Sequence, residues 1–506
     1  MRSSCFQLGI RGVTLASAAL FASVAFSPVA SAFDLDWSGQ FRSEAWTVRN
    51  YAFSQGVGAG GYTVSSSGDE NTYFQTLFMK FTPKAIVNDN VILKSEWWMG
   101  DAALGMFGDS APYLSGNRWV TSSQSRGAVF SVQRLWAELL TDFGTVQVGR
   151  MPLHWGLGAV WNKGEALNAR APSTGDAVRL VAKFGSFSLA PAFIKYGSGN
   201  TIGGSCSVDE GTGVCTSTDG LGGVTDYSMV FRYENVDEDL EGGVNFIRRI
   251  ARSKQDPEYG YLPPGGVSGS SIFNTWDLYF RKKWGSVELS AEAPIVSGSI
   301  GSFKYDTIAV AGELKWTANE RFALIGKGGL APGQAGGVTL PTDFRAYSLH
   351  PDYRVGLVMF NLQPANFSGP TYFNHPEIHS NEIASPFDAP IVNARYGSVE
   401  GRLDYEKWVF TAETVFAFAD QTAKAGEQFY NTRSRSFVEN VSGVDQSSFM
   451  GWELDLGAEL KWDDQVTAGV KAGWFVPGDY FAFANGASAA SLKTVFAASA
   501  TLGVTF

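Results

Sequence analysis

Long hydrophobic runs, charge, cysteine and histidine are all scarce in this sequence. Only 17 % of the 506 residues are charged, and the chain has 3 cysteines and 4 histidines. Beyond residue 26 no stretch reaches the roughly 18 consecutive apolar residues that a transmembrane helix requires. The formal net charge of −10 argues against nucleic-acid binding. Membrane-spanning helices and a nucleic-acid partner are therefore not expected.

The motifs of common enzyme classes are also missing. There is no Gly-x-Ser-x-Gly turn for a nucleophilic serine, and no glycine-rich phosphate loop follows a predicted strand. His375 and His379 have the spacing of a metal-binding pair, but Pro376 disfavours the helix that would bring both rings to one face. We therefore predict a protein that is not an enzyme and that has no metal site and no cofactor.

Apolar and aromatic residues are abundant but dispersed. Hydrophobic residues make up 44 % of the chain, aromatics 14 %, and there are 58 glycines. A chain with these proportions and no hydrophobic block belongs to one of two classes. It is a large soluble β protein, or a membrane barrel whose apolar residues recur at every second position.

The first residues have the order of a secretory signal peptide. Arg2 and Arg11 precede an apolar run that ends at Phe26, and the small residues Ala30-Ser31-Ala32 follow. We expect cleavage before Phe33, which makes 1–32 a leader and 33–506 a single mature domain. The alternative, a membrane anchor, is disfavoured because the run is short for a spanning helix.

Two cysteines remain after this cleavage. Cys206 and Cys215 lie in a segment rich in Gly, Ser, Thr and Asp, and an exported protein folds in an oxidising compartment. We predict a local disulfide that closes a small loop. Metal binding is the weaker interpretation, since no histidine lies nearby.

Alternating segments joined by short turns recur along the chain. In 78–98, two such segments meet at Asn88-Asp89-Asn90, residue types that tolerate the backbone of tight turns. Single strands are expected at 36–49 and at about 491–506. The other hairpins are expected at 129–152, 177–196, 225–250, 272–296, 306–329, 391–419 and 449–476.

Long polar connections separate these hairpins. They fall at 50–70, 101–127, 197–224, 251–271, 330–390, 420–448 and 477–488. Strict alternation of short turns with long loops is typical of transmembrane barrels, and the tally of about 18 strands is even, as in bacterial barrels. We predict an all-β fold: a closed antiparallel barrel of about 18 strands, with short periplasmic turns and long extracellular loops.

The apolar stretch 352–360 is the ambiguous part of this count. As a strand it needs a returning partner before residue 391, and five prolines between them leave little room. We interpret it as part of a long loop, 330–390, that folds onto or into the barrel. The alternative gives about 20 strands.

Charged residues alternate with apolar ones on the predicted strands. A charge at mid-bilayer on the lipid face costs about 2–4 kcal/mol, so these charges are expected to point inward. The predicted pore-lining residues are Arg42, Glu44, Lys94, Glu96, Arg134, Glu138, Arg150, Glu288, Glu292, Glu400, Arg402, Glu453 and Lys471. Tryptophans near strand ends are expected to form the interface girdles; they are Trp37, Trp46, Trp316, Trp408, Trp452, Trp462 and Trp474.

The last residues resemble the terminal strand of Gram-negative outer-membrane proteins. Leu502, Val504 and Phe506 alternate, and the chain ends on the aromatic residue. The resemblance implies that this strand is read by the barrel-assembly machinery, and that it pairs with the first strand because a closed barrel has no edge. It also implies the outer membrane of a Gram-negative bacterium, with its lipid and lipopolysaccharide as partners.

Within this class the chain looks like the alginate-export and substrate-specific porin group. The segment Gly149-Arg-Met-Pro-Leu-His-Trp-Gly-Leu-Gly158 resembles a stretch found in several large outer-membrane barrels. Two interpretations stay open: an inward constriction, or a strand end and turn with Trp155 at the interface. A mixed-charge interior argues against export of a polyanion. We predict a passive channel for small hydrophilic solutes; the alternatives are an exopolysaccharide exporter and a plugged barrel for adhesion or display.

Overall fold

The computed structural model describes the strands and most short connections of the chain. The described residues are 34–50, 71–99, 130–196, 207–208, 215–216, 224–251, 270–362, 390–431, 436–483, 485 and 492–506. The predicted leader 1–32, Cys206 with its predicted disulfide, and the histidines 375 and 379 lie outside them. Among the described residues, no helix is long and apolar enough to cross a membrane.

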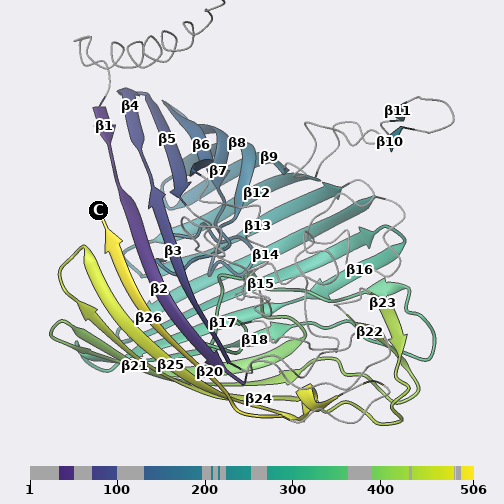
Figure 1. Ribbon diagram of the computed structural model, residues 1–506. Coiled ribbons are helices and arrows are strands. Elements are labelled where there is room, and N and C mark those ends of the chain that lie inside the picture. Colours follow the sequence, from purple (N-terminus) through teal and green to yellow (C-terminus); the bar gives the residue numbers. More distant parts are fainter. Residues whose placement is uncertain are drawn as a thin grey trace, which may run out of the picture.

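The wall is a closed antiparallel barrel of 18 strands (Figure 1). Three wall strands are each interrupted by a short irregularity and carry two labels. In chain order the strands are β1 Asp34–Asp36 with β2 Gly39–Arg49, β3 Asn71–Phe81 with β4 Lys84–Asn88, β5 Val91–Met99, β6 Phe130–Thr141, β7 Gly144–Pro152, β8 Thr174–Phe184, β9 Phe187–Tyr196, β12 Val224–Asn235, β13 Leu240–Ala251, β14 Ser271–Trp284, β15 Val287–Ile300, β16 Phe303–Ile308 with β17 Val310–Thr317, β18 Phe322–Ala331, β20 Ala394–Tyr405, β21 Trp408–Ala419, β24 Phe449–Lys461, β25 Val466–Pro477 and β26 Val495–Thr505.

The barrel closes between its first and last strands, as predicted. β2 pairs with β26 in an antiparallel register that runs from Gln40 opposite Thr505 to Arg49 opposite Phe496. The ring of Phe506 packs edge-on against Phe81, with centroids 5.7 Å apart. Closure pairs the backbone groups that an open sheet edge would leave exposed.

The predicted hairpins all form, and their turns are short. β8 and β9 meet at Gly185, and β14 and β15 meet at Gly285, with φ angles of 60° and 56° that an L side chain adopts only with strain. The stretch 352–360 is not a strand, so the count of 18 is confirmed over the alternative of 20.

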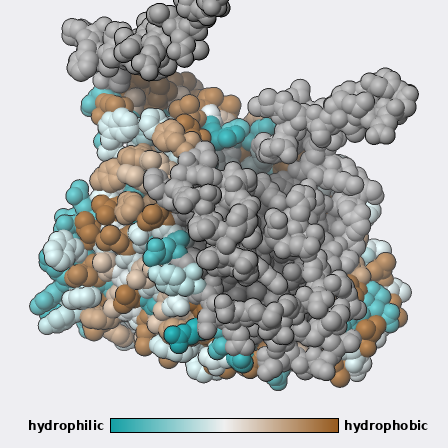
Figure 2. Space-filling view, in the orientation of Figure 1, coloured by the Kyte–Doolittle hydropathy of each residue, from teal (hydrophilic) through white to brown (hydrophobic). Residues whose placement is uncertain are grey.

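The wall has an apolar outer face and a polar inner face. On β24, Leu454 and Leu456 are exposed outward, whereas Glu453 and Asp455 alternate with them and are buried inside. Brown, hydrophobic side chains are frequent on the part of the wall at the left of Figure 2. A barrel with this distribution has the surface of a transmembrane protein, because lipid chains cannot hydrate charge.

The tryptophans near strand ends follow the same division, with one exception. Trp46 is 4 % exposed and lies on the inner face, so its assignment to the girdle is wrong. It is an even number of residues from the buried Arg42 and Glu44, and residues two apart share a face of a strand. The exposed members are Trp37, Trp316, Trp408, Trp452, Trp462 and Trp474.

Several short elements lie outside the wall. β19 Asp343–Phe344 pairs in parallel with β16, and β22 Gln428–Asn431 pairs with β23 Ser436–Glu439. β10 Ser207–Val208 pairs with β11 Cys215–Thr216, and η2 Asp479–Ala482 is a 3₁₀ turn. The largest apolar cluster lies between wall strands and residues 344–362, so the core is inside the barrel.

Candidate functional site

All the predicted pore-lining residues except Arg150 lie on the inner face, but they differ in what they contact. One group is buried against backbone that folds into the barrel; it comprises Arg42, Glu44, Glu96, Arg134, Glu292 and Glu453. The other group is less deeply buried; it comprises Lys94, Glu138, Glu288, Glu400, Arg402 and Lys471. The distinction decides which charges fix structure and which remain open to the interior.

Arg150 lies on the outer face, so its inward assignment is wrong. In the register it stands opposite Leu135, which is 56 % exposed, and opposite Asp176. Its Nε lies 2.6 Å from Oδ1 of Asp176. Arg150 is three residues from Gln147, whose amide donates to the inward Glu138, and an odd number of steps changes the face of a strand.

The segment 153–173, which joins β7 to β8, folds into the barrel. Trp155 is buried, and its ring packs edge-on against Tyr279 of β14 with centroids 6.0 Å apart. A turn at Gly156, with φ 53°, directs the chain inward, and the amide of Trp155 donates to the carbonyl of Trp161. The interpretation that placed Trp155 at the membrane interface is therefore wrong, and the inward interpretation holds for this segment.

Two wall arginines bind the backbone of 153–173. Arg42 donates from NH1 to the carbonyls of Leu167 and Ala169 at 2.7 and 3.1 Å. Arg134 donates from NH2 to the carbonyl of Lys163 at 2.9 Å. Each guanidinium supplies several donors in a fixed plane, which suits it to hold irregular backbone.

Buried acids complete the pairing of these arginines. Glu44 accepts from NH2 of Arg170 at 2.7 Å and lies 3.3 Å from Nε of Arg42. Glu96 accepts from NH1 of Arg134 at 2.9 Å. Buried charges are costly unless they are paired, so loss of either glutamate leaves a buried cation uncompensated.

Glu292 of β15 holds the same segment through its backbone amides. Its Oε2 accepts from the amide of Ala159 at 3.3 Å, and its Oε1 accepts from Val160 at 3.1 Å. A Cβ at Gly156 would lie 2.5 Å from Oε2 of Glu292, so only glycine permits this approach. Successive amides that converge on one anion form a concave binding site for it. We call this arrangement the first anchor.

Glu453 of β24 holds a second inward segment, 346–362, in the same way. Its carboxylate accepts from the amides of Leu357, Val358 and Met359 at 2.6–2.8 Å. Gly356 precedes them with φ 80°, and a Cβ there would lie 3.1 Å from Oε2 of Glu453. This second anchor repeats the first: a left-handed Gly-Leu step, consecutive amides and one buried wall glutamate.

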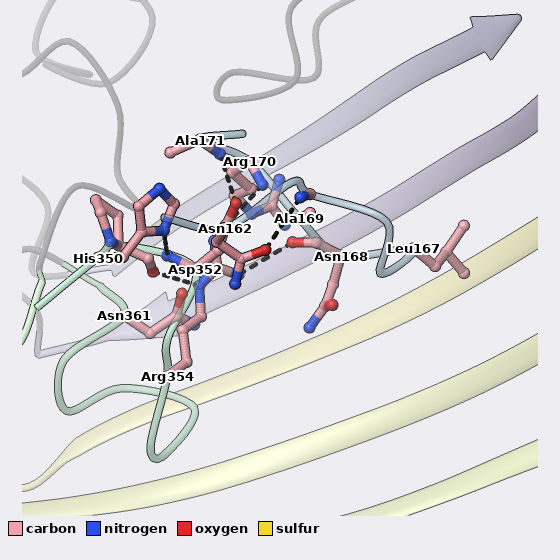
Figure 3. A network of polar contacts seen from close by, with 12 residues as sticks. Asn162, Leu167, Asn168, Ala169, Arg170, Ala171, His350, Asp352, Arg354 and Asn361 are labelled. Carbon is pink, nitrogen blue, oxygen red and sulfur yellow. Dashed lines mark hydrogen bonds and ion pairs between the residues drawn. The ribbon is translucent and has the colours of Figure 1, made fainter. Parts of the chain in front are cut away.

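The two inward segments contact one another through Asp352 (Figure 3). Its Oδ1 accepts from the amide of Arg170 at 2.8 Å, and its Oδ2 accepts from Ala171 at 2.9 Å. Arg354 donates from NH1 to the carbonyl of Asn168 at 3.1 Å and from NH2 to Oδ1 of Asp352 at 2.8 Å. The segments therefore form one body across the interior.

His350 adds a further link between the segments. Its Nδ1 accepts from the amide of Asp352 at 3.1 Å, and its Nε2 lies 3.0 Å from Oγ of Ser173. Its own amide donates to the carbonyl of Ala159 at 2.8 Å. With Nδ1 as acceptor, the neutral ring carries its proton on Nε2 and donates it to Ser173.

Arg354 and His154 are titratable groups of these segments whose environment lowers their pKa. Burial lowers the pKa of Arg354 to about 10, while the carboxylate of Asp352 opposes this shift, so the guanidinium stays charged at neutral pH. Burial also lowers the pKa of His154, and the nearby Lys163 adds to the decrease. His154 is therefore neutral at pH 7.

Charges of both signs remain partly exposed on the inner wall. Arg402 donates to Asp404 at 3.0 Å, and their side chains are 38 % and 39 % exposed. Lys327 lies 3.6 Å from Glu313 and donates to the carbonyl of Arg354 at 3.4 Å. The interior next to the inward body is thus polar and of mixed sign.

Sequence reasoning missed the partners that come from the segments themselves. Arg170, His350, Asp352 and Arg354 were not selected, because none of them lies on a strand with an alternating pattern. A signal existed in the repeated Gly-Leu step of two otherwise apolar loop stretches, 156–157 and 356–357.

No protein-family model matches the chain, and no curated protein matches it. Several solved structures are similar to it. OccK11 (OpdR) of Pseudomonas aeruginosa is 10 % identical over 95 % of this chain and 99 % of its own, with a TM-score of 0.48. OpdK of Pseudomonas aeruginosa, solved with vanillate, is 10 % identical over 93 % of this chain and 98 % of its own, with a TM-score of 0.48. OmpT of Vibrio cholerae is 10 % identical over 94 % of this chain and 99 % of its own, with a TM-score of 0.36.

The chain is an outer-membrane β-barrel. That assignment follows from the closed antiparallel wall, the apolar outer face and the charged interior described above.

Proposed function

We propose that this barrel is a channel for the passive diffusion of small hydrophilic solutes across the outer membrane of a Gram-negative bacterium. The observation that carries the proposal is the inward body, 153–173 joined to 346–362 and fixed to charged walls by the two anchors. A diffusion channel requires a polar passage with a fixed constriction, and a fixed body inside a charged barrel supplies one.

The inner charges divide between the two tasks of such a channel. In this proposal the less deeply buried charges line the passage and set its selectivity, because their side chains are more exposed to the interior. They are Lys94, Glu138, Glu288, Glu400, Arg402 and Lys471. The buried group, from Arg42 to Glu453, fixes the constriction. Each lining charge alone is expected to be replaceable without loss of the barrel.

Single-channel recording in planar bilayers tests the proposal. We expect uniform conductance steps from the folded barrel. Lys471→Gln and Glu400→Gln are expected to move the reversal potential in a salt gradient in opposite directions, because each removes one sign of charge from the passage. A folded barrel that gives no steps contradicts the proposal and supports a plugged barrel that acts through its loops.

The remaining alternative is exopolysaccharide export. An exporter would conduct and be blocked by a polyanion added on the periplasmic side. The paired and mixed charges of the inner wall favour small solutes instead, since a path for a polyanion needs an excess of cations.

Assembly partners are proposed on the same basis. Leu502 and Phe506 are each 42 % exposed on the outer face of the closing strand β26 and the residue after it. This exposure supports recognition of the strand by the barrel-assembly machinery before closure. Outer-membrane lipid and lipopolysaccharide would cover the apolar outer face.

A further inference from the structure

Cations gather on the outer face of the barrel at the loop ends of β7 to β14, which lie side by side in the wall (Figure 1). Arg150, Asp176, Lys195 and Thr225 stand opposite one another on β7, β8, β9 and β12. Arg248 of β13 is opposite Tyr227, which is two residues farther from the loop end than Thr225. We call Arg150, Lys195 and Arg248 the outer basic row.

Three exposed aromatics lie next to the outer basic row: Phe193 is below Lys195, Tyr227 is level with Arg248, and Trp276 is below Arg248. Phe193, Tyr227 and Trp276 are 43 %, 49 % and 49 % exposed on the same face. Phe193 is two residues inward from Lys195 on its strand, and Tyr227 is opposite Arg248. Exposed aromatics mark the boundary between the acyl chains and the headgroups. Arg150 and Lys195 therefore lie at the level of the lipid headgroups, on the side of the long loops, and Arg248 lies at the boundary, where a long cationic side chain extends toward the headgroups.

Two of these cations have only neutral hydrogen-bond partners among the described residues. Lys195 donates from Nζ to Oγ1 of Thr225 at 3.1 Å, and Arg248 donates from NH1 to Oδ1 of Asn274 at 3.3 Å. The single acid of the row, Asp176, receives both bonds of Arg150 at 2.6 and 2.9 Å. The row thus has two positive charges in excess, which neutral oxygens solvate but do not compensate.

Two outer-face cations at the loop ends of other strands show the contrast. Arg395 is paired with Asp420 at 2.8 Å, and Lys304 is paired with Asp306 at 2.5 Å. Both pairs are neutral as units and require no anion. The excess at the outer basic row distinguishes it from these sites and calls for an anionic partner at headgroup depth.

We propose that the outer basic row binds the phosphate groups of an anionic glycolipid headgroup in the outer leaflet. Strands are about 4.8 Å apart, so the backbones of Arg150 and Lys195 are separated by roughly 10 Å across β8, a span over which one large headgroup reaches both cations. Arginine and lysine both bind phosphate, arginine through two parallel bonds. The inference does not depend on whether the barrel conducts.

Native mass spectrometry of the barrel with lipid A tests the proposal. Wild-type barrel is expected to retain lipid A more tightly than lipid A from which the phosphates have been removed. Lys195→Gln and Arg248→Gln are each expected to weaken retention roughly fivefold, and the double variant more, because each cation near a membrane surface contributes a similar amount. Lys282→Gln is the matched control: it removes an outer-face cation at the turn end of β14, on the other side of the membrane.

Each possible result either supports or contradicts the proposed lipid site. Selective loss in the two row variants, with Lys282→Gln unchanged, supports the site. Equal retention of phosphorylated and dephosphorylated lipid A overturns it, as does equal loss in the control. Retention of phosphatidylglycerol or inorganic phosphate as strongly as lipid A overturns the assignment to a glycolipid. Heat-modifiable gel mobility verifies that every variant is a folded barrel before its lipid content is compared.

Discussion

The two inward segments are held by anchors of the same design, but they differ in how many other contacts hold them. Segment 153–173 is bound at Ala159 and Val160 by Glu292, and again by Arg42 and Arg134. Lys80 and Gln40 also donate to its carbonyls, at Gly164 and Glu165, with distances of 3.4 and 3.1 Å. The first segment is therefore fixed at several independent points.

Segment 346–362 has fewer wall contacts in the described part of the chain. Glu453 and Asp455 both accept from the amide of Leu357 at 2.8 Å. Besides these, Tyr305 donates to the carbonyl of Ala346 at 3.2 Å and Lys327 to that of Arg354 at 3.4 Å. The side chains of Asp352 and Arg354 bind this segment to the first segment. The comparison indicates a hierarchy: the first segment is a platform, and the second depends on one anchor, on that platform and on two single hydrogen bonds from the wall.

The largest effect is therefore expected at Glu453. Replacement by Ala removes the acceptor of the buried amides of Val358 and Met359, whereas Leu357 keeps its bond to Asp455; each buried amide left unpaired costs about 1–3 kcal/mol. We expect amide exchange at 358–359 to accelerate by at least a hundredfold, and channel current to become noisy. The measurement is hydrogen exchange by mass spectrometry in detergent or nanodiscs.

Glu459→Ala is the matched control for Glu453→Ala. Glu459 lies on the inner face of the same strand, but its side chain is exposed rather than buried. Its removal is expected to leave exchange at 358–359 unchanged. Equal acceleration in both variants would show that any charge loss on β24 loosens the segment, and the second anchor would have no special role.

An intermediate effect is expected at Asp352, which links the platform to the second segment. Asn at this position keeps one acceptor oxygen for either Arg170 or Ala171 and removes the charge beside Arg354. We expect a local cost of about 1–2 kcal/mol, seen as faster exchange at those two amides. Exchange at Ala159 is expected to stay slow, because Glu292 holds it separately; a uniform acceleration would contradict the hierarchy.

A smaller effect is expected at Glu292, although its anchor has the same design. Ala here leaves two amides without their acceptor, but Arg42 and Arg134 still hold the segment at Leu167 and Lys163. Faster exchange should stay confined to Ala159 and Val160, with about tenfold less acceleration than Glu453→Ala produces. Glu288→Ala, four residues away on the same strand, is the control. Acceleration that spreads along all of 153–173 would refute the idea of redundant fixation.

The wall was predictable from the sequence because its determinants are local. Period-two alternation gave the inner position of Glu453, and short polar turns gave hairpins such as the one at Gly185. The face on which a residue lies is harder to predict close to the end of a strand, and Arg150 shows this. An error of one residue in the alternation moves a side chain to the other face.

The roles of the inner charges were not predictable, because their partners lie far away in the chain. Arg42 binds the carbonyl of Leu167, 125 residues later, and Glu453 binds amides about 95 residues earlier. The alternating pattern does not distinguish Glu292, which anchors a segment, from Glu288, whose side chain is more exposed. Only the fold brings the Gly-Leu steps to particular glutamates.

The smallest expected effect is a pH dependence of the platform through His154. Burial and the nearby Lys163 lower the pKa of this ring in the folded segment below its ordinary value. A base with a lowered pKa binds its proton more readily when the segment opens, so acidification favours the open form. We expect exchange at neighbouring amides to accelerate modestly as the pH falls from 7 through the ordinary histidine pKa, after correction for the intrinsic rate. The effect is small because the side chain is partly exposed. His154→Gln should abolish it; a pH dependence that persists in this variant would place the responsible proton elsewhere.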